Sequence, residues 1–337
     1  MKEKKFSLKK LFAIRESALV ALIVLFAVAI VCFKSNYLSY KNVMVILLSA
    51  ASTGIIACGM TLLLVSGAMD LSVGSAAGLA SVITCQFIRS MNMPVWIAIL
   101  LGLLIVGVLG GAVNGLISVK FRVSPFVITL GINYVYKGLT QLISQGIGLT
   151  GFPDAFNVLG QGSLAGIQYP ILISIVLVII FDILLRKSRI FRKSYYVGGN
   201  EKAAEVTGIN VQNVKIVNFI ITGVLAAFTG VLIASRFGSA SVTIGSGMEM
   251  EVITACVIGG ASLSGGEGTV LGAYLGSLLL SMIVSALNML GVDAYWQNVI
   301  TGAILVITVC LDSVLKMRRE TNVKLEAAKN RGKKQEA

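Results

Sequence analysis

Several polar side chains interrupt the long apolar stretches of this sequence. Asp70 opens the string DLSVGSAAG, where its carboxylate could cap a helix by accepting a hydrogen bond from an amide two or three residues on, or could act directly in gating. The other candidates are hydroxyl or amide side chains and a tryptophan: Ser72, Asn114, Thr129, Asn133, Asn288, Trp296 and Gln297. Uncharged hydrogen-bonding groups beside an aromatic face suit a neutral, hydroxyl-rich solute, although each could equally join two helices. Lys137, one helical turn after Asn133, could extend toward water or form an ion pair.

The sequence lacks the commonest general base and metal ligand, which is histidine, and it lacks the usual catalytic and metal-binding motifs. Histidine is absent, and the five cysteines lie in apolar segments without a C-x-x-C pair. The phosphate-binding string G-x-x-x-x-G-K-[S/T] is absent too, because GGASLSGGEGT is rich in glycine but lacks the lysine. We therefore expect no catalytic residue, no metal site and no cofactor in this chain.

The composition is that of a membrane protein. Of 337 residues, 56% are hydrophobic and 13% are charged, whereas soluble domains have about 25% charged residues. Apolar runs near twenty residues recur, which is the length a helix needs to cross a hydrocarbon core of about 30 Å. The net charge of +13 is better explained by basic loops and tails beside membrane lipid than by a nucleic-acid partner.

We expect an all-α polytopic membrane protein with about ten transmembrane helices, some of them short or broken. The expected spans are residues 17–33, 43–65, 71–88, 95–119, 124–144, 169–185, 215–235, 250–263, 268–290 and 296–315. The third and eighth are rich in glycine and serine, and the eighth is short, so re-entrant or broken helices would also fit. A single domain of residues 17–315 would thus lie between basic tails of residues 1–16 and 316–337.

Basic residues orient these spans. With the N-terminus inside, the loops that face the cytoplasm contain Lys120, Arg122 and a cluster within residues 186–193, while the outward loops carry fewer basic residues. Ten spans with both termini cytoplasmic satisfy the positive-inside rule. Glycines four residues apart recur in several spans, as at 107, 111 and 115, and would let helix backbones approach closely or widen a pathway.

A polar segment, YYVGGNEKAAEVTGIN at residues 195–210, lies between the sixth and seventh spans. Asn200 is a favourable N-cap, Glu201 would begin a helix where the macrodipole is positive, and Gly208 would end it. A helix of about two turns is marginal alone in water. It must therefore dock, either on a partner through the small apolar surface of Ala203, Ala204 and Val206 or on its own membrane domain.

This segment resembles the cytoplasmic coupling loop of sugar permeases in bacterial ABC importers of the ribose/xylose/galactose type. GMTLLLVSGAMDLSVGSAAGLA is similar to their motif between the second and third spans, and SPFVITLGINYVYKGLTQLISQG to their fifth-span region. IGGASLSGGEGTVLGAYLGSLLL and ALNMLGVDAYWQNVITGAILVITVCLD resemble their C-terminal signatures. The resemblance covers about residues 15–315, and Ala68 and Met69 depart mildly from the usual Gly-Ile before the aspartate.

The resemblance implies a permease of the bacterial cytoplasmic (inner) membrane that carries a monosaccharide of the ribose or pentose type. It implies three partners: a second permease subunit, either another copy or a paralogue, an ATP-binding subunit that holds ATP and Mg, and an extracytoplasmic sugar-binding protein. The loop 186–214 would couple to the ATPase. Carried over by position, the coupling residues are Gly198, Gly199, Asn200, Glu201, Ala203, Ala204 and Gly208.

Other functions remain open at this point. The same machinery could carry a nucleoside, a sugar-like signal or a branched-chain amino acid. From another class, an ion-coupled secondary transporter could use Asp70, although it would leave the helix of the coupling loop without a role. A structural membrane scaffold would carry no solute.

Overall fold

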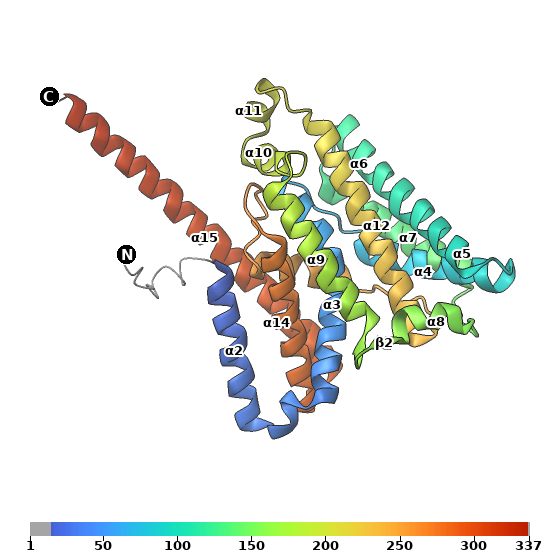
Figure 1. The fold of residues 1–337 in the computed structure, drawn as a ribbon. Helices are drawn as coiled ribbons and strands as arrows, with labels where there is room; N and C mark the ends of the chain where they lie inside the picture. Colours follow the sequence, from blue (N-terminus) through green and yellow to red (C-terminus); the bar gives the residue numbers. More distant parts are fainter. Residues whose placement is uncertain (1–14, 336–337) are drawn as a thin grey trace, which may run out of the picture.

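The computed structural model describes residues 15–335, with side chains described from Glu16 to Val314, except Ala294, and at Met317. Predictions that fall on residues 1–14 and 336–337 of the two tails lie outside this range. Figure 1 shows a bundle of helices from which the last helix projects.

Helices occupy all the predicted spans. They are α2 (Arg15–Phe33), α3 (Tyr40–Val65), α4 (Val73–Ser90), α5 (Val95–Gly102) continued by the π-helical η2 (Leu103–Leu109) and α6 (Gly110–Lys120), α7 (Pro125–Ser144), α9 (Tyr169–Lys187), α12 (Val211–Phe237), α13 (Met248–Ile258), α14 (Val270–Met289) and α15 (Ala294–Gln335). Seven helical stretches in the described chain are long and apolar enough to cross a membrane, and α4, α7 and α13 are not among them. The all-α polytopic class is thus confirmed. The division into one domain and two tails stays a prediction, since α15 continues through the boundary expected at residue 315.

The eighth span is broken, as its composition suggested. Helix α13 has 11 residues, so at 1.5 Å per residue it is too short for a core of about 30 Å. It is preceded by β4 (Ser239–Ala240), which pairs antiparallel with β1 (Leu149–Thr150), and by an irregular stretch to residue 247. That stretch lies against α4, where a Cβ on Gly78 would be 2.6 Å from the carbonyl oxygen of Ile244. The glycines of the third span therefore make room for irregular backbone.

Helix α12 is the centre of the bundle and packs on α3, α4 and α6. A Cβ on Gly111 would lie 2.6 Å from the carbonyl oxygen of Phe219, and one on Gly107 would lie 2.7 Å from the Cα of Val224. Helix α12 and the continuous helix of η2 and α6 thus pack backbone to backbone. This packing confirms the close approach predicted from the glycine spacing.

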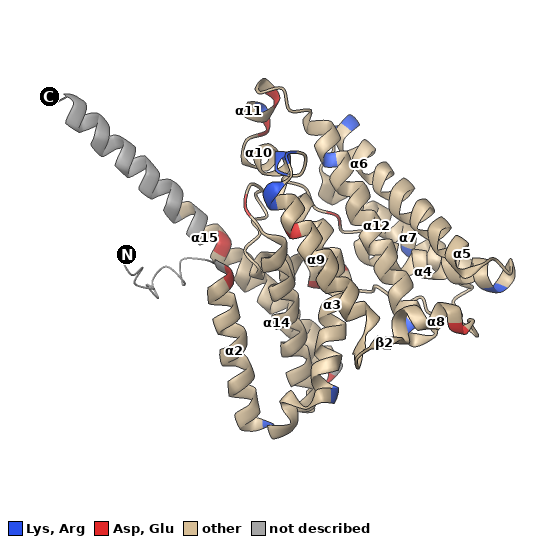
Figure 2. Ribbon diagram, in the orientation of Figure 1, with Lys and Arg blue, Asp and Glu red and all other residues tan. Residues whose placement is uncertain are grey.

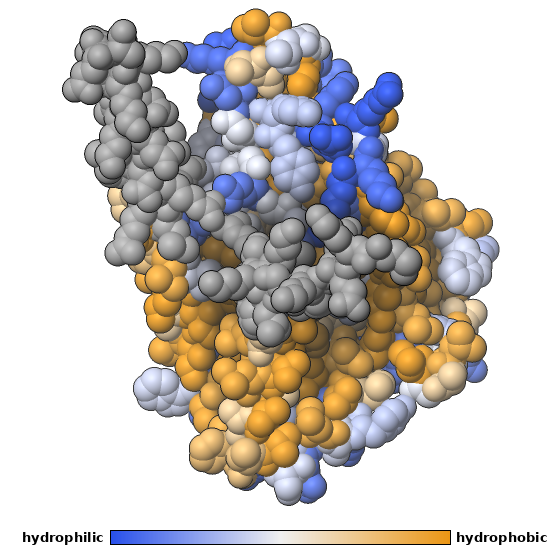
Figure 3. All heavy atoms as spheres, turned by 60° about the vertical axis from the view of Figure 1, so that its left-hand side comes forward, coloured by the Kyte–Doolittle hydropathy of each residue, from blue (hydrophilic) through white to orange (hydrophobic). Residues whose placement is uncertain are grey.

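The remaining elements lie at the two ends of the bundle (Figure 1). One end carries α10 (Lys193–Gly199) and α11 (Glu201–Val206), and we call it the α11 end. The opposite end, the α8 end, carries η1 (Ser35–Leu38), α8 (Asp154–Gln161) and the hairpin of β2 (Ser163–Leu164) and β3 (Ile167–Gln168). Basic residues gather at the α11 end (Figure 2), and hydrophobic residues cover the side of the molecule below it (Figure 3).

Candidate functional site

Helix α11 forms where the sequence predicts it. Asn200 is in extended conformation, and its side-chain oxygen accepts a hydrogen bond of 3.0 Å from the amide of Ala203. The helix runs from Glu201 to Val206, and Gly208 follows with φ +82°, in the left-handed region that ends helices. The predicted cap, start and stop are all confirmed.

The apolar surface expected on α11 is divided between two sides. Ala204 is buried and packs with Val197 and Val211, so it holds the helix on its own domain. Ala203 is exposed, and Val206 is 89% exposed. Beside the helix, a hollow of about 550 Å³ is bounded by Glu201, Glu205 and the turn between α6 and α7. The helix is thus anchored on one side and free on the other.

Three chain segments meet at the end of α10, at what we call the glycine junction, formed by Gly67, Gly198, Gly265 and Gly266. The amide of Gly266 donates a hydrogen bond of 2.9 Å to the carbonyl oxygen of Val65, at the end of α3. A Cβ on Gly198 would collide with that oxygen and lie 2.6 Å from the Gly266 nitrogen. A displacement of α10 and α11 would therefore reach α3 and the loop before α14 directly.

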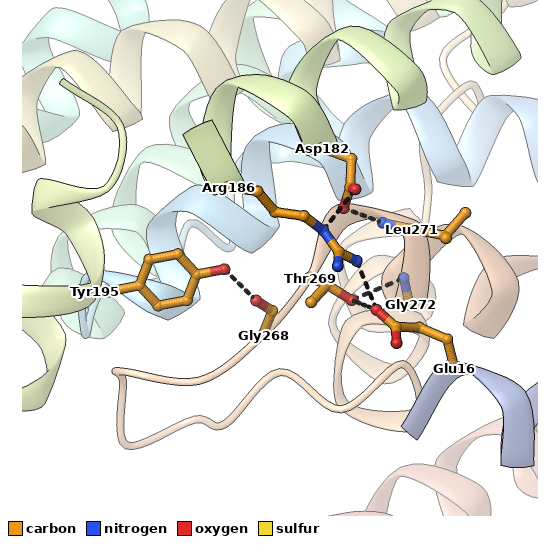
Figure 4. A network of polar contacts seen from close by, with 8 residues as sticks. All are labelled: Glu16, Asp182, Arg186, Tyr195, Gly268, Thr269, Leu271 and Gly272. Atoms are coloured by element: carbon orange, nitrogen blue, oxygen red, sulfur yellow. Dashed lines mark hydrogen bonds and ion pairs between the residues drawn. The ribbon is translucent and has the colours of Figure 1, made fainter. Parts of the chain in front are cut away.

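A polar network lies where the loop before α14 enters that helix (Figure 4). Arg186 of α9 forms ion pairs of 2.6 Å with Glu16 and 2.7 Å with Asp182. The Thr269 hydroxyl donates to Glu16 at 3.0 Å, and Asp182 accepts a hydrogen bond of 3.1 Å from the amide of Leu271. These contacts join the start of α2, the end of α9 and the start of α14.

Tyr195 connects α10 to the same loop. Its hydroxyl donates a hydrogen bond of 2.6 Å to the carbonyl oxygen of Gly268 (Figure 4). Burial raises the pKa of Tyr195, so the hydroxyl keeps its proton and acts as the donor. Sequence reasoning missed this contact and the network, because the partners are far apart in the chain.

Four of the predicted polar residues come together at the start of α4. Asp70 is 1% exposed, and its Oδ1 accepts hydrogen bonds of 2.8 Å from the Ser72 amide and 2.6 Å from the Ser72 hydroxyl. Asn114 of α6 donates to Asp70 Oδ2 at 3.1 Å and to the Ser72 hydroxyl at 2.9 Å. Thr129 of α7 accepts a hydrogen bond of 3.0 Å from the amide of Leu71. Asp70 thus closes the turn that leads into α4 and joins this turn to α6, but the N-cap position of α4 is Ser72, so Asp70 is not the helix cap that one alternative predicted.

Asn133 and Lys137 continue this line along α7. Asn133 is 4% exposed, and its side-chain oxygen has no hydrogen-bond partner in the described structure. The ammonium of Lys137 lies 3.9 Å from a carboxylate oxygen of Glu249 in α13. Of the two alternatives for Lys137, the structure shows the ion pair.

The last three predicted residues lie at a different place. Gln297 donates a hydrogen bond of 2.6 Å to Asn288, and Trp296 is 60% exposed. This end of α14 contacts the beginning of α3, since Ser285 donates to Asn42, whereas Asp70 follows the other end of that 26-residue helix. The eight predicted polar residues therefore form two separate groups.

Comparison with known proteins finds one family that matches most of the chain and several relatives that are permeases. Residues 42–309 match the family described as "Branched-chain amino acid transport system / permease component". The ribose import permease protein of Bacillus subtilis is 37% identical over 279 residues, which cover 82% of this chain and 86% of the relative. The galactose/methyl galactoside import permease protein of Escherichia coli is 34% identical, covering 88% and 94%. The L-arabinose ABC transporter permease protein of Azospirillum brasilense is 34% identical, covering 84% and 83%. No solved structure matches the chain significantly.

Proposed function

Because this chain belongs to the branched-chain amino acid transport system / permease component family, and is thus a multi-pass permease of the inner membrane, we propose that it forms the solute pathway of an ATP-driven sugar importer. The family match confirms the resemblance seen in the sequence. Within this proposal the solute is a monosaccharide, a pentose or a related sugar.

The choice of a sugar is supported by the names of the relatives and by the polar residues. The relatives above carry ribose, galactose and arabinose in their names. Asp70, Ser72, Asn114, Thr129 and Asn133 supply hydrogen-bonding groups near or along α7. The family description points instead to branched-chain amino acids, so leucine is the comparison solute in any test.

Coupling to a separate ATPase is supported above all by the two-sided docking of α11. A helix of six residues is held by Ala204 on its own domain while Ala203 and Val206 stay exposed. In this proposal the exposed side contacts the ATP-binding subunit, which holds ATP and Mg. Asn200, Glu201 and Gly208 define the helix, and Gly198 and Gly199 connect it to the membrane domain. The α11 end and both termini then face the cytoplasm.

The remaining partners follow from the same proposal. A second permease subunit, either another copy or a paralogue, completes the pathway, and an extracytoplasmic binding protein delivers the sugar to the α8 end. The basic residues that gather at the α11 end agree with this orientation (Figure 2).

An ion-coupled carrier is the second candidate, because Asp70 and Glu249 are buried carboxylates in the membrane domain. Liposomes distinguish the two functions. We expect uptake of radiolabelled D-ribose, D-galactose or L-arabinose only when the ATPase, ATP and binding protein are present. Uptake by the permease alone under a proton or sodium gradient would establish the carrier instead.

The docking side of α11 has its own test. We expect Ala203→Arg to leave the permease folded but to stop ATP-driven uptake, because the new side chain occupies the exposed side. Ala204→Arg is the matched variant, and we expect it to destabilise the permease itself, because Ala204 is buried. Normal uptake by the Ala203→Arg protein would mean that the ATPase does not dock on the exposed side of α11.

A further inference from the structure

A polar cavity lies inside the membrane domain, away from α11. It measures about 180 Å³ and lies between α4, α7 and the irregular stretch before α13. Its polar lining comes from Ser75, Lys137, Thr140, Gln141 and Ser246. The lining residues of α7 are Lys137, Thr140 and Gln141, so the cavity lies beside the C-terminal half of this 20-residue helix.

Glu249 forms an ion pair with Lys137, which lines the cavity, and only one of the two Glu249 carboxylate oxygens takes part in it. The residue is 7% exposed, and one carboxylate oxygen lies 3.9 Å from the Lys137 ammonium. The other oxygen, Oε2, is buried and has no hydrogen-bond partner within the described residues. A Cβ on Gly74 would collide with this same oxygen, so the glycine provides the space for it. Ionisable groups at membrane depth are costly and usually functional.

The broken eighth span explains how a carboxylate can be held there. Glu249 lies in the first turn of α13, where the helix macrodipole favours negative charge. The macrodipole does not form hydrogen bonds with the carboxylate. The distance of 3.9 Å to the Lys137 ammonium is also longer than a hydrogen bond. Hydrogen-bonding capacity is therefore left over on both Glu249 and Lys137.

The cavity lies on a polar stripe that runs along α7. Thr129, Asn133, Lys137, Thr140 and Ser144 recur every three or four residues and so share one side of the helix. Toward the α8 end the stripe reaches a second hollow of about 360 Å³, which Ser144 lines. In the other direction it reaches Asn133 and the Asp70 cluster.

We propose that the cavity lined by Lys137, next to the ion pair of Lys137 with Glu249, binds one small polyhydroxylated solute during its passage, an inference that rests on the proposed sugar import. The solute hydroxyls donate to the Glu249 carboxylate and accept from the Lys137 ammonium, while Gln141 and Ser246 orient the solute. A branched aliphatic amino acid could match the ion pair with its own charges. However, its aliphatic side chain would offer no hydrogen-bonding group to Gln141 and Ser246, so a neutral polyol fits this lining better.

The test uses the complete importer in liposomes, with its ATPase and binding protein, and D-ribose, D-galactose and L-arabinose as probes. Glu249→Gln is expected to raise the KM for sugar uptake about tenfold or more, as for the loss of a hydrogen bond to a charged group. ATP hydrolysis stimulated by the binding protein is expected to continue. Glu251→Gln is the matched control on the same helix, since the Glu251 side chain bonds to Thr53 instead, and its KM should not change.

Gln141→Leu keeps the test decisive if Glu249→Gln fails to fold, because Gln141 is exposed and lines the cavity. We expect the same rise in KM with unchanged thermal stability. Wild-type kinetics in the Gln141→Leu protein, or stronger inhibition of uptake by L-leucine than by the sugars, would overturn the proposal. A wild-type importer that takes up no sugar would overturn the proposed function, whereas variants that transport sugar normally would overturn only this site.

Discussion

The main-chain amide of Gly266 donates a hydrogen bond to the carbonyl oxygen of Val65 across 2.9 Å. The two residues belong to the loop before α14 and to the end of α3, and Gly198 of α10 lies against both. A rigid contact between three backbones transmits a displacement better than flexible side chains would. The glycine junction therefore provides a direct physical connection between α11 and the membrane helices.

Replacing Gly198 with alanine tests this junction. The new Cβ would collide with the Val65 carbonyl oxygen and lie 2.6 Å from the Gly266 nitrogen, so backbone must move. We expect Gly198→Ala to lower stability by about 1–3 kcal/mol, the usual range for overpacking. Thermal unfolding of the detergent-solubilised permease measures the change.

Gly199→Ala is the matched control, because a Cβ at Gly199 would meet nothing within 4 Å. We expect it to unfold at the wild-type temperature. Equal destabilisation by both alanines would mean that the junction does not depend on the close contact of Gly198.

The cap of α11 is the subject of the second prediction. Asn200→Ala removes the hydrogen bond from the Ala203 amide. We expect the stability of this helix of six residues to fall by about 1 kcal/mol. Faster hydrogen exchange of the α11 amides would report it. Asn210→Ala removes the equivalent cap from the 27-residue α12, where we expect fraying of the first turn only. If α11 exchanges at the wild-type rate in the Asn200→Ala protein, the fold around Ala204 holds it without the cap.

Features that depend on neighbouring residues could be predicted from the sequence. Asn200 reaches an amide only three residues away, and the helices at the ten expected positions follow from the lengths of apolar runs. The apolar surface of α11 was only partly predicted. Adjacent residues on a helix point about 100° apart, so Ala204 faces inward while Ala203 faces outward.

Contacts between distant segments could not be predicted. Arg186 meets Glu16 across 170 positions, and Lys137 meets Glu249 through a bend that depends on Gly245 and Gly247, both with φ near +80°. These pairs require the three-dimensional path of the chain, for which hydropathy gives no information. The same limit explains why Asn288 and Gln297 were grouped with Asp70 although they lie elsewhere.

Tyr37, in the turn between α2 and α3, predicts a dependence of stability on pH. It is fully buried, its hydroxyl donates to the carbonyl oxygen of Met282 at 2.7 Å, and burial raises its pKa from 10.0 to about 12. Because the folded pKa is the higher one, the stabilisation is complete below pH 10.0 and is lost as the pH rises through about 12. Thermal unfolding should show wild type losing stability across this window more steeply than Tyr37→Phe. Parallel pH profiles for the two proteins would contradict this prediction.

The hydrogen bonds between Asp70 and Asn114 predict a pair of compensating substitutions. Asp70→Ala leaves the Ser72 amide and hydroxyl without their acceptor and removes one of the two acceptors of the Asn114 amide, and we expect a loss of about 1–3 kcal/mol or more for these buried groups. Asp70→Asn alone places an amide group against the donating amide of Asn114. Combining it with Asn114→Asp restores one carboxylate and one amide with the donors reversed, so we expect the double variant to be more stable than Asp70→Asn. A double-mutant cycle of thermal unfolding measures this coupling. If the two substitutions add independently, the carboxylate of Asp70 only closes its own turn, and its contact with α6 contributes no stability.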